Sequence, residues 1–209
     1  MKIQNTLKKA FLAICAGVAA VFITGCQSTG TGGARYVDSQ GTETIVSLDR
    51  INIQDWNNAA NELVASLLTS GALERAPQQP AILAISRIIN NTQQQVDTDS
   101  LVKKIRVDLN KTGKVVTTTT MGLGGRAEDP LAKSASEYAA FMNDDPAPPA
   151  TMPHYSLSGK LLEDRARVGN KRQVTYSFQL SLTEVATGLA VWEDEKQITK
   201  QGKRASVGW

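Results

Sequence analysis

One segment of the sequence alternates without a break between apolar and polar side chains. From Gln173 to Thr183, valine, tyrosine, phenylalanine and leucine occupy every second position, with glutamine, threonine and serine between them. Successive side chains of a β-strand point to opposite faces, so this pattern predicts a strand with one buried face and one solvated face. The fold must therefore contain a sheet that is packed on one side.

Two weaker strand patterns flank this segment. His154 to Glu163 alternates more loosely, and Leu189 to Thr199 follows on the other side. Gly169-Asn170 and Ala186-Thr187-Gly188 carry the residues of tight turns between them. These three strands are predicted to form an antiparallel meander, after which a basic tail, residues 200–209, frays.

The first half of the domain shows two helical patterns. One begins at Asp55 and ends before Gly71, and the other is capped by Asp97 or Thr98 and stops at Gly113. In each, apolar residues recur at spacings of three and four, which places them on one helix face. These residues are Trp56, Ala60, Leu63, Val64 and Leu67 in the first pattern and Leu101, Val102, Ile105 and Leu109 in the second.

Three further segments favour strands. Ala81 to Ile89 is almost continuously apolar, as in a strand covered on both faces, and Asn90-Asn91-Thr92 ends it. Lys114 to Thr120 is rich in β-branched residues, and Thr42 to Leu48 is a weak, short candidate. Together the elements predict an α+β fold, a mixed β-sheet with a C-terminal antiparallel meander and two main helices packed on one face.

The segment from Met121 to Pro153 breaks this order. It contains several glycines and prolines and one short helical pattern, from Leu131 to Met142. Loops of this kind either connect elements or carry function, and the sequence leaves both interpretations open.

The N-terminus has the three parts of a secretory signal peptide. Lysines come first, then an apolar run from Ala10 to Ile23, then Thr24-Gly25 before Cys26. The run holds about 14 residues, fewer than the roughly 20 that span a bilayer as a helix. We therefore expect residues 1–25 to be removed as a signal peptide.

Ile23-Thr24-Gly25-Cys26 resembles the bacterial lipobox. That resemblance implies S-diacylglycerol and N-acyl groups such as palmitate on Cys26, and several acyl chains hold a protein at a bilayer almost permanently. Gln27 stands where an aspartate would favour inner-membrane retention, so we expect an outer-membrane lipoprotein that faces the periplasm. The alternative is an ordinary secreted protein with an incidental cysteine.

Residues 26–41 are small and polar and predict a short flexible tether, with a typical end-to-end distance of roughly 20 to 25 Å. Residues 42–199 then form one globular domain, because about 160 residues suffice for one core and no second linker divides them. Cys15 leaves with the signal peptide, so the domain keeps no cysteine pair for a disulfide.

The formal net charge of +3 belongs to the signal peptide. Lys2, Lys8 and Lys9 are three of the 23 basic residues, and none of the 20 acidic residues lies there. The mature chain is therefore balanced in charge, and we expect no nucleic-acid partner.

Catalytic patterns are missing from the sequence. His154 is the only histidine and is interpreted as an ordinary residue at a strand end, so no metal site is expected. No Gly-x-Ser-x-Gly occurs, and Gly122-Leu123-Gly124-Gly125 lacks the lysine of a phosphate-binding loop. We therefore expect no enzyme, no cofactor and no small-molecule ligand.

Adjacent carboxylates could in principle hydrolyse a glycan strand, but such neighbours are usually solvated charges. They are Glu128-Asp129, Asp144-Asp145, Glu163-Asp164 and Glu193-Asp194-Glu195. Trp56 and Trp192 are interpreted as core residues rather than a ligand platform, and the role of Trp209 is not readable.

Several segments in one order resemble the peptidoglycan-synthase activators of the LpoB type. They are the lipobox, Ile88-Ile89-Asn90-Asn91-Thr92, Leu109-Asn110-Lys111-Thr112-Gly113-Lys114, Tyr155-Ser156-Leu157-Ser158-Gly159, Tyr176-Ser177-Phe178-Gln179-Leu180 and Thr187-Gly188-Leu189-Ala190-Val191-Trp192. The resemblance implies a non-enzymatic α+β domain related in shape to the N-terminal domain of TolB. It implies allosteric stimulation of a bifunctional synthase of the penicillin-binding protein 1B type, and thus control of cell wall synthesis and cell shape.

Two features depart from the best-known form of this family. The tether is short and rich in glycine and threonine rather than long and rich in proline, and the insert from Met121 to Pro153 is longer. The resemblance transfers no partner-binding residue to this chain. A short tether also suits the alternative function, an outer-membrane assembly or secretion lipoprotein like the curli-secretion lipoprotein.

Overall fold

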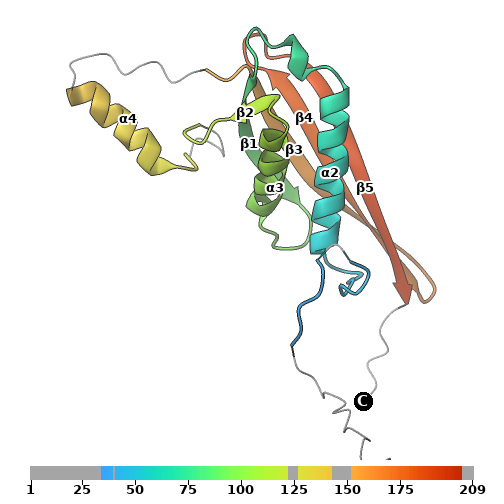
Figure 1. The fold of residues 1–209 in the computed structure, drawn as a ribbon. Coiled ribbons are helices and arrows are strands. Elements are labelled where there is room, and N and C mark those ends of the chain that lie inside the picture. The colour runs from blue at the N-terminus through green and yellow to red at the C-terminus, as the bar shows by residue number, and fades with distance from the viewer. Residues whose placement is uncertain (1–33, 40, 122–126, 143–151, 204–209) are drawn as a thin grey trace, which may run out of the picture. The chain divides into compact units, whose positions relative to one another are not determined.

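A computed structural model describes residues 34–39, 41–121, 127–142 and 152–203 (Figure 1). The chain divides into two units, residues 1–37 and residues 38–209, and the described part of the first, residues 34–37, contains no helix or strand. The predicted signal peptide, Cys26 and Trp209 lie outside the described residues. No described helix has both the length and the apolar character needed to cross a membrane.

The second unit is built on a mixed sheet in the order β2-β1-β3-β4-β5. β1 runs parallel to both β2 and β3, whereas β3, β4 and β5 form antiparallel pairs. The predicted α+β class and C-terminal meander are confirmed. The strands are β1 (Ala81–Asn91), β2 (Val115–Thr117), β3 (Tyr155–Val168), β4 (Lys171–Glu184) and β5 (Ala190–Lys203).

Two main helices, α2 (Ile53–Thr69) and α3 (Thr98–Lys111), cover one face of the sheet (Figure 1). A 3-10 turn, η1 (Leu73–Arg75), leads from α2 towards β1. Of the two predicted caps of α3, Asp97 is the residue that acts, because its side chain accepts from the Asp99 N–H at 2.9 Å. Gly113 follows the C-cap with a φ of 69°, a conformation that suits glycine.

The core lies between the helices and the sheet. Trp56 of α2 packs edge-on against Phe178 of β4, with ring centroids 5.6 Å apart, as expected for a core-facing tryptophan. Gly159 of β3 allows a close approach here, since a Cβ on it would stand 2.5 Å from the carbonyl oxygen of Gln179. The largest fully buried side chains are Tyr155, Tyr176, Phe178, Leu63, Leu67, Leu83, Ile85, Leu101, Ile105, Leu109, Leu157 and Leu161.

One predicted strand is absent, a second is shorter than predicted, and part of the predicted tail is a strand. Thr42 to Leu48 forms turns and irregular chain rather than a strand. β2 covers only Val115–Thr117 of the predicted Lys114 to Thr120. Residues 200–203, expected to fray, continue β5, and Lys200 is only 9% exposed.

The predicted helix within the Met121 to Pro153 segment exists as α4 (Pro130–Met142). It buries none of its residues, and Leu131, Tyr138 and Phe141 are largely exposed. The glycines at 122–125 and the prolines at 146–149 lie outside the described residues.

Candidate partner-binding surface

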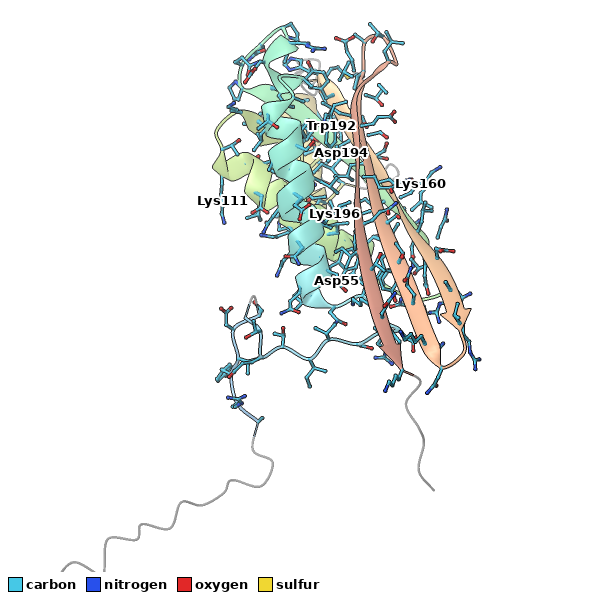
Figure 2. The ribbon with its side chains drawn as sticks, turned by 90° about the vertical axis from the view of Figure 1, so that its right-hand side faces the viewer. Asp55, Lys111, Lys160, Trp192, Asp194 and Lys196 are labelled. Atoms are coloured by element: carbon cyan, nitrogen blue, oxygen red, sulfur yellow. The ribbon has the colours of Figure 1, made fainter. Side chains whose placement is uncertain are left out.

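The helices leave the other face of the β3-β4-β5 meander uncovered. Figure 2 shows Lys160 of β3 on the side of the sheet away from α2, whereas Trp192, Asp194 and Lys196 of β5 lie towards α2. We call the uncovered side the open face. Its residues are Ser156, Ser158, Lys160, Leu162 and Asp164 of β3, Gln173, Thr175, Ser177, Gln179, Ser181 and Thr183 of β4, and Glu193, Glu195, Gln197, Thr199 and Gln201 of β5.

The side chains of the open face are tied to each other across the strands. Ser181 donates to Glu193 at 2.8 Å, and the hydroxyls of Thr175 and Thr199 lie 3.0 Å apart. Gln201 donates to Gln173 at 2.6 Å. Side chains held in this way lose less freedom when a partner binds, so the face is organised in advance for a polar contact.

The β5 side of the open face is acidic. Glu193 and Glu195 are exposed there, and Glu195 accepts from the amides of Gln179 and Gln197. The opposite side of β5 carries inward charges, including Lys196, which pairs with Glu62 of α2. Inward charges on an edge strand oppose strand addition by another chain. A partner is therefore expected on the open face rather than along the β5 edge.

A buried ion pair holds the chain at the point where it enters the domain. Lys200 of β5 pairs with Asp55 in the first turn of α2, and its ammonium also donates to the carbonyl oxygens of Arg50 at 2.8 Å and Ser47 at 3.2 Å. We call residues 47–51 the strap. Two of its carbonyls bind an ammonium instead of a neighbouring strand, and one of them, that of Ser47, belongs to the segment 42–48 that was predicted as a strand.

Tyr176 and Gln94 extend this cluster beneath the strap. The Lys200 nitrogen lies 5.5 Å from the centre of the Tyr176 ring. Gln94 donates to the Tyr176 hydroxyl at 2.8 Å, and its carbonyl oxygen accepts from the Ile51 N–H at 3.0 Å. Burial raises the pKa of Tyr176, although the hydrogen bond from Gln94 acts in the opposite direction.

The cluster was not predicted from the sequence, which placed Lys200 in a fraying tail. The only available signal was that alternation continues through Ile198 and Lys200, which share the helix-facing side of β5. Because lysine is charged, its presence on that side interrupts the apolar alternation that predicts a buried strand face.

His154 fastens β1 to β3. Its side-chain Nδ1 accepts from the Ile82 N–H at 3.1 Å, and its backbone N–H donates to the Ile82 carbonyl oxygen at 2.8 Å. These contacts agree with the interpretation of a structural residue at a strand end. Within the described ranges, no group of three or more histidine, cysteine, aspartate or glutamate side chains is placed to hold a metal ion.

The predicted carboxylate pairs have structural contacts. Glu128 pairs with Lys103 and with the buried Arg106, whose pKa is lowered by desolvation. Asp129 accepts from the Ala132 N–H at 3.0 Å at the start of α4, and Glu163 pairs with Arg165. Asp144-Asp145 lies outside the described residues. Glu128, Asp129 and Glu163 are thus engaged in a helix cap and in ion pairs, whereas Glu193 and Glu195 accept hydrogen bonds from Ser181 and from Gln179 and Gln197.

The family model described as peptidoglycan-synthase activator LpoB matches residues 55–198. The C-terminal domain of LpoB from Salmonella enterica shares 16% identity over 69% of this chain and 98% of its own, with a TM-score of 0.41. The corresponding domain from Escherichia coli shares 17% over the same fractions, also at 0.41. The NMR structure of E. coli LpoB shares 20% over 85% of this chain and 87% of its own, at 0.38.

No curated protein sequence matches the chain. The family match nevertheless extends from the first turn of α2 into β5 and covers more than half of the sequence. The chain therefore belongs to the LpoB family, whose members are non-enzymatic activators of peptidoglycan synthases.

Proposed function

We propose that this activator binds a bifunctional synthase of the penicillin-binding protein 1B type and stimulates it allosterically from an outer-membrane anchor on Cys26. The observation that carries the proposal is the family match across the domain from α2 to β5. Family membership already makes a peptidoglycan synthase the partner. The proposal adds the type of synthase, the mechanism and the anchor.

Allosteric stimulation requires that the activator bind one state of the synthase better than another. A preference of about 1 to 3 kcal/mol changes the ratio of the two states roughly 5- to 150-fold. The activator supplies no reacting group in this mechanism. Its contribution is a surface that fits the active state.

We propose the open face as that surface. Its side chains are exposed or half-buried and are linked by hydrogen bonds such as those between Ser181 and Glu193 and between Thr175 and Thr199. The helix-covered face, by contrast, is occupied by the core. A polar face of this kind suits a partner that binds reversibly, because it leaves no large apolar area exposed when the partner departs.

The first experiment measures glycan polymerisation by the cognate synthase with the mature chain carrying Cys26→Ser. We expect stimulation, and we expect Ser177→Arg in the centre of the open face to reduce binding to the synthase about tenfold or more. Ala65→Arg, on the exposed side of α2, is the matched control and should stimulate normally. If the Cys26→Ser chain without an arginine substitution neither binds nor stimulates the synthase, the proposed partner is rejected.

Equal loss with both arginine variants would reject the open face while leaving the partner intact. We also expect the lipidated chain to form no ring-like oligomers in detergent. Ring-like oligomers would instead favour the secretion class of lipoprotein that the short tether suggested.

The anchor is tested in the cells that make the protein. Labelled palmitate should be incorporated into the wild-type chain and not into Cys26→Ser, and the labelled chain should fractionate with the outer membrane. Gln27→Asp should shift it to the inner membrane. Palmitate in Cys26→Ser would contradict the predicted lipidation site.

A further inference from the structure

The end of the meander nearest the strap concentrates positive charge. In the last two rungs of the sheet, Lys171 lies opposite Lys203, and Arg167 lies opposite Arg172. Like charges placed directly opposite each other destabilise a sheet. The fold therefore tolerates electrostatic repulsion within these two pairs, which neutral residues at the same positions would not cause. We call Arg167, Val168, Lys171, Arg172 and Lys203 the basic tip.

Most of this charge is uncompensated. Among the residues that the structure describes, Arg167, Lys171 and Lys203 are exposed and form no ion pair. Arg172 differs, since it lies 3.5 Å from the carboxylate of Asp49 in the strap. Val168, at the turn between β3 and β4, is 81% exposed. The tip thus presents an apolar residue surrounded by free cations.

A hollow opens among the arginines of this region. It has a volume of about 260 Å³ and is lined by Arg165, Ala166, Arg167, Arg172, Gln173 and Val174. The planar guanidinium group binds the oxygens of a phosphate with two parallel hydrogen bonds. Arg165 and Arg172 of this lining contact Asp49, and Arg165 also pairs with Glu163, so Arg167 is the arginine of the hollow that is left to bind a phosphate-bearing anion.

The basic tip lies at the end of the domain where the chain enters. Asp49 of the strap contacts Arg165 and Arg172, and a Cβ on Gly202 would stand 3.1 Å from Leu48 of the strap. Figure 1 shows the end of β5 and the turn between β3 and β4 at the same end of the sheet as the start of α2. Even fully extended, the chain from Cys26 to Ser47 spans at most about 75 Å. A lipid on Cys26 keeps this end within that distance of a membrane.

We propose that the basic tip docks on the phosphate headgroups of anionic lipids in the membrane that holds the anchor. The inference rests on the proposed lipidation of Cys26. Arg167, Lys171 and Lys203 meet the negative surface, Val168 enters the headgroup region, and the arginine-lined hollow takes a lipid phosphate. The centre of the open face, around Ser177, lies away from the tip along β4 and stays accessible to the synthase.

The test uses the mature chain with Cys26→Ser, so that the acyl chains do not dominate binding. It is sedimented with vesicles of phosphatidylcholine alone or of phosphatidylcholine mixed with phosphatidylglycerol. We expect binding to the mixed vesicles only, falling as salt rises, because screening weakens attraction between exposed charges. Arg167→Glu with Lys171→Glu should lower the bound fraction at least about tenfold.

The control variant carries Lys111→Glu and Lys133→Glu, the same change in charge at exposed positions of α3 and α4. Figure 2 shows Lys111 on α3, away from the end of the meander. The control should bind as the unmodified surface does. Both variants should melt normally, since the tip variant replaces two like-charge pairs with opposite ones.

Equal binding to both kinds of vesicle, or equal loss in the tip and control variants, would overturn the proposal. Retention on purified sacculi without vesicle binding would also overturn it and assign the tip to a wall polymer. Stimulation of the synthase in detergent is the separate readout. If the chain stimulates the synthase but does not bind vesicles, only membrane docking by the basic tip is rejected. If it binds vesicles but does not stimulate the synthase, only the proposed function is rejected.

Discussion

The same strands form both faces of the meander, but the two faces have different roles. On β4, Phe178 is 1% exposed and packs against Trp56, whereas its neighbour Gln179 points to the open face and bonds to Glu195. The helix-covered face carries the stability of the domain and the open face carries little of it. Substitutions on the open face are therefore free to report on binding, while those on the covered face report first on folding.

The largest contrast is expected between adjacent residues of β4. Phe178→Ala removes a fully buried ring and leaves a cavity, so it should lower the free energy of unfolding by about 3 to 5 kcal/mol. Gln179→Ala removes a half-buried polar side chain outside the core and should change the free energy of unfolding by less than about 0.5 kcal/mol. Urea denaturation of both variants measures the difference. Similar costs for the two would break the distinction between the faces.

A second prediction concerns the charge on the covered face. Lys200→Ala leaves the Asp55 carboxylate and the strap carbonyls without their ammonium, and should cost about 3 kcal/mol. Lys203→Ala, further along β5 at an exposed position, should cost less than about 0.5 kcal/mol. In a double-mutant cycle with Asp55→Ala, the two costs should not add, because the residues share one interaction. Additive costs would mean that the pair does not stabilise the strap.

These contrasts show how far the sequence predicts the fold. Periodicity predicted the meander, both main helices and the core-facing tryptophan, because burial of one face requires a regular apolar repeat. It did not predict the strap or the role of Lys200. Those depend on a contact between residues 145 positions apart, Asp55 and Lys200, and a charge pair leaves no periodic trace.

The two helices α3 and α4 show a second limit. Both were predicted as helices, and both exist. α3 buries Leu101, Ile105 and Leu109, whereas α4 buries none of its residues. A helical repeat of apolar residues indicates a helix, but it does not say whether a surface is available to cover them. In the same way, alternation along β4 predicted that one side of this strand is solvated. It could not predict the hydrogen bonds across the open face, because these depend on which residues of the neighbouring strands lie opposite.

A third prediction tests the covered face without changing charge. A Cβ at Gly159 would stand 2.5 Å from the Gln179 carbonyl and 2.7 Å from Leu180, so the backbone must shift in Gly159→Ala. We expect a cost of about 1 to 3 kcal/mol. Ser158→Ala, the adjacent residue on the open face, should cost less than about 0.5 kcal/mol. Thermal melting of the two variants decides whether the close approach of β3 and β4 is needed.

The smallest expected effect depends on pH. Tyr176→Phe removes the hydroxyl that accepts from Gln94 and should cost about 1 kcal/mol at neutral pH. Burial raises the pKa of Tyr176 in the folded state, so its protonated form contributes stability that is fully present below the unfolded value of about 10. That contribution is lost as pH rises from there through the raised folded pKa. The phenylalanine variant has no such proton, and urea denaturation across this range should show its deficit shrinking above pH 10. A deficit that stays constant would mean that Tyr176 reaches water on the covered face, and the separation between the two faces would then be incomplete at the strap.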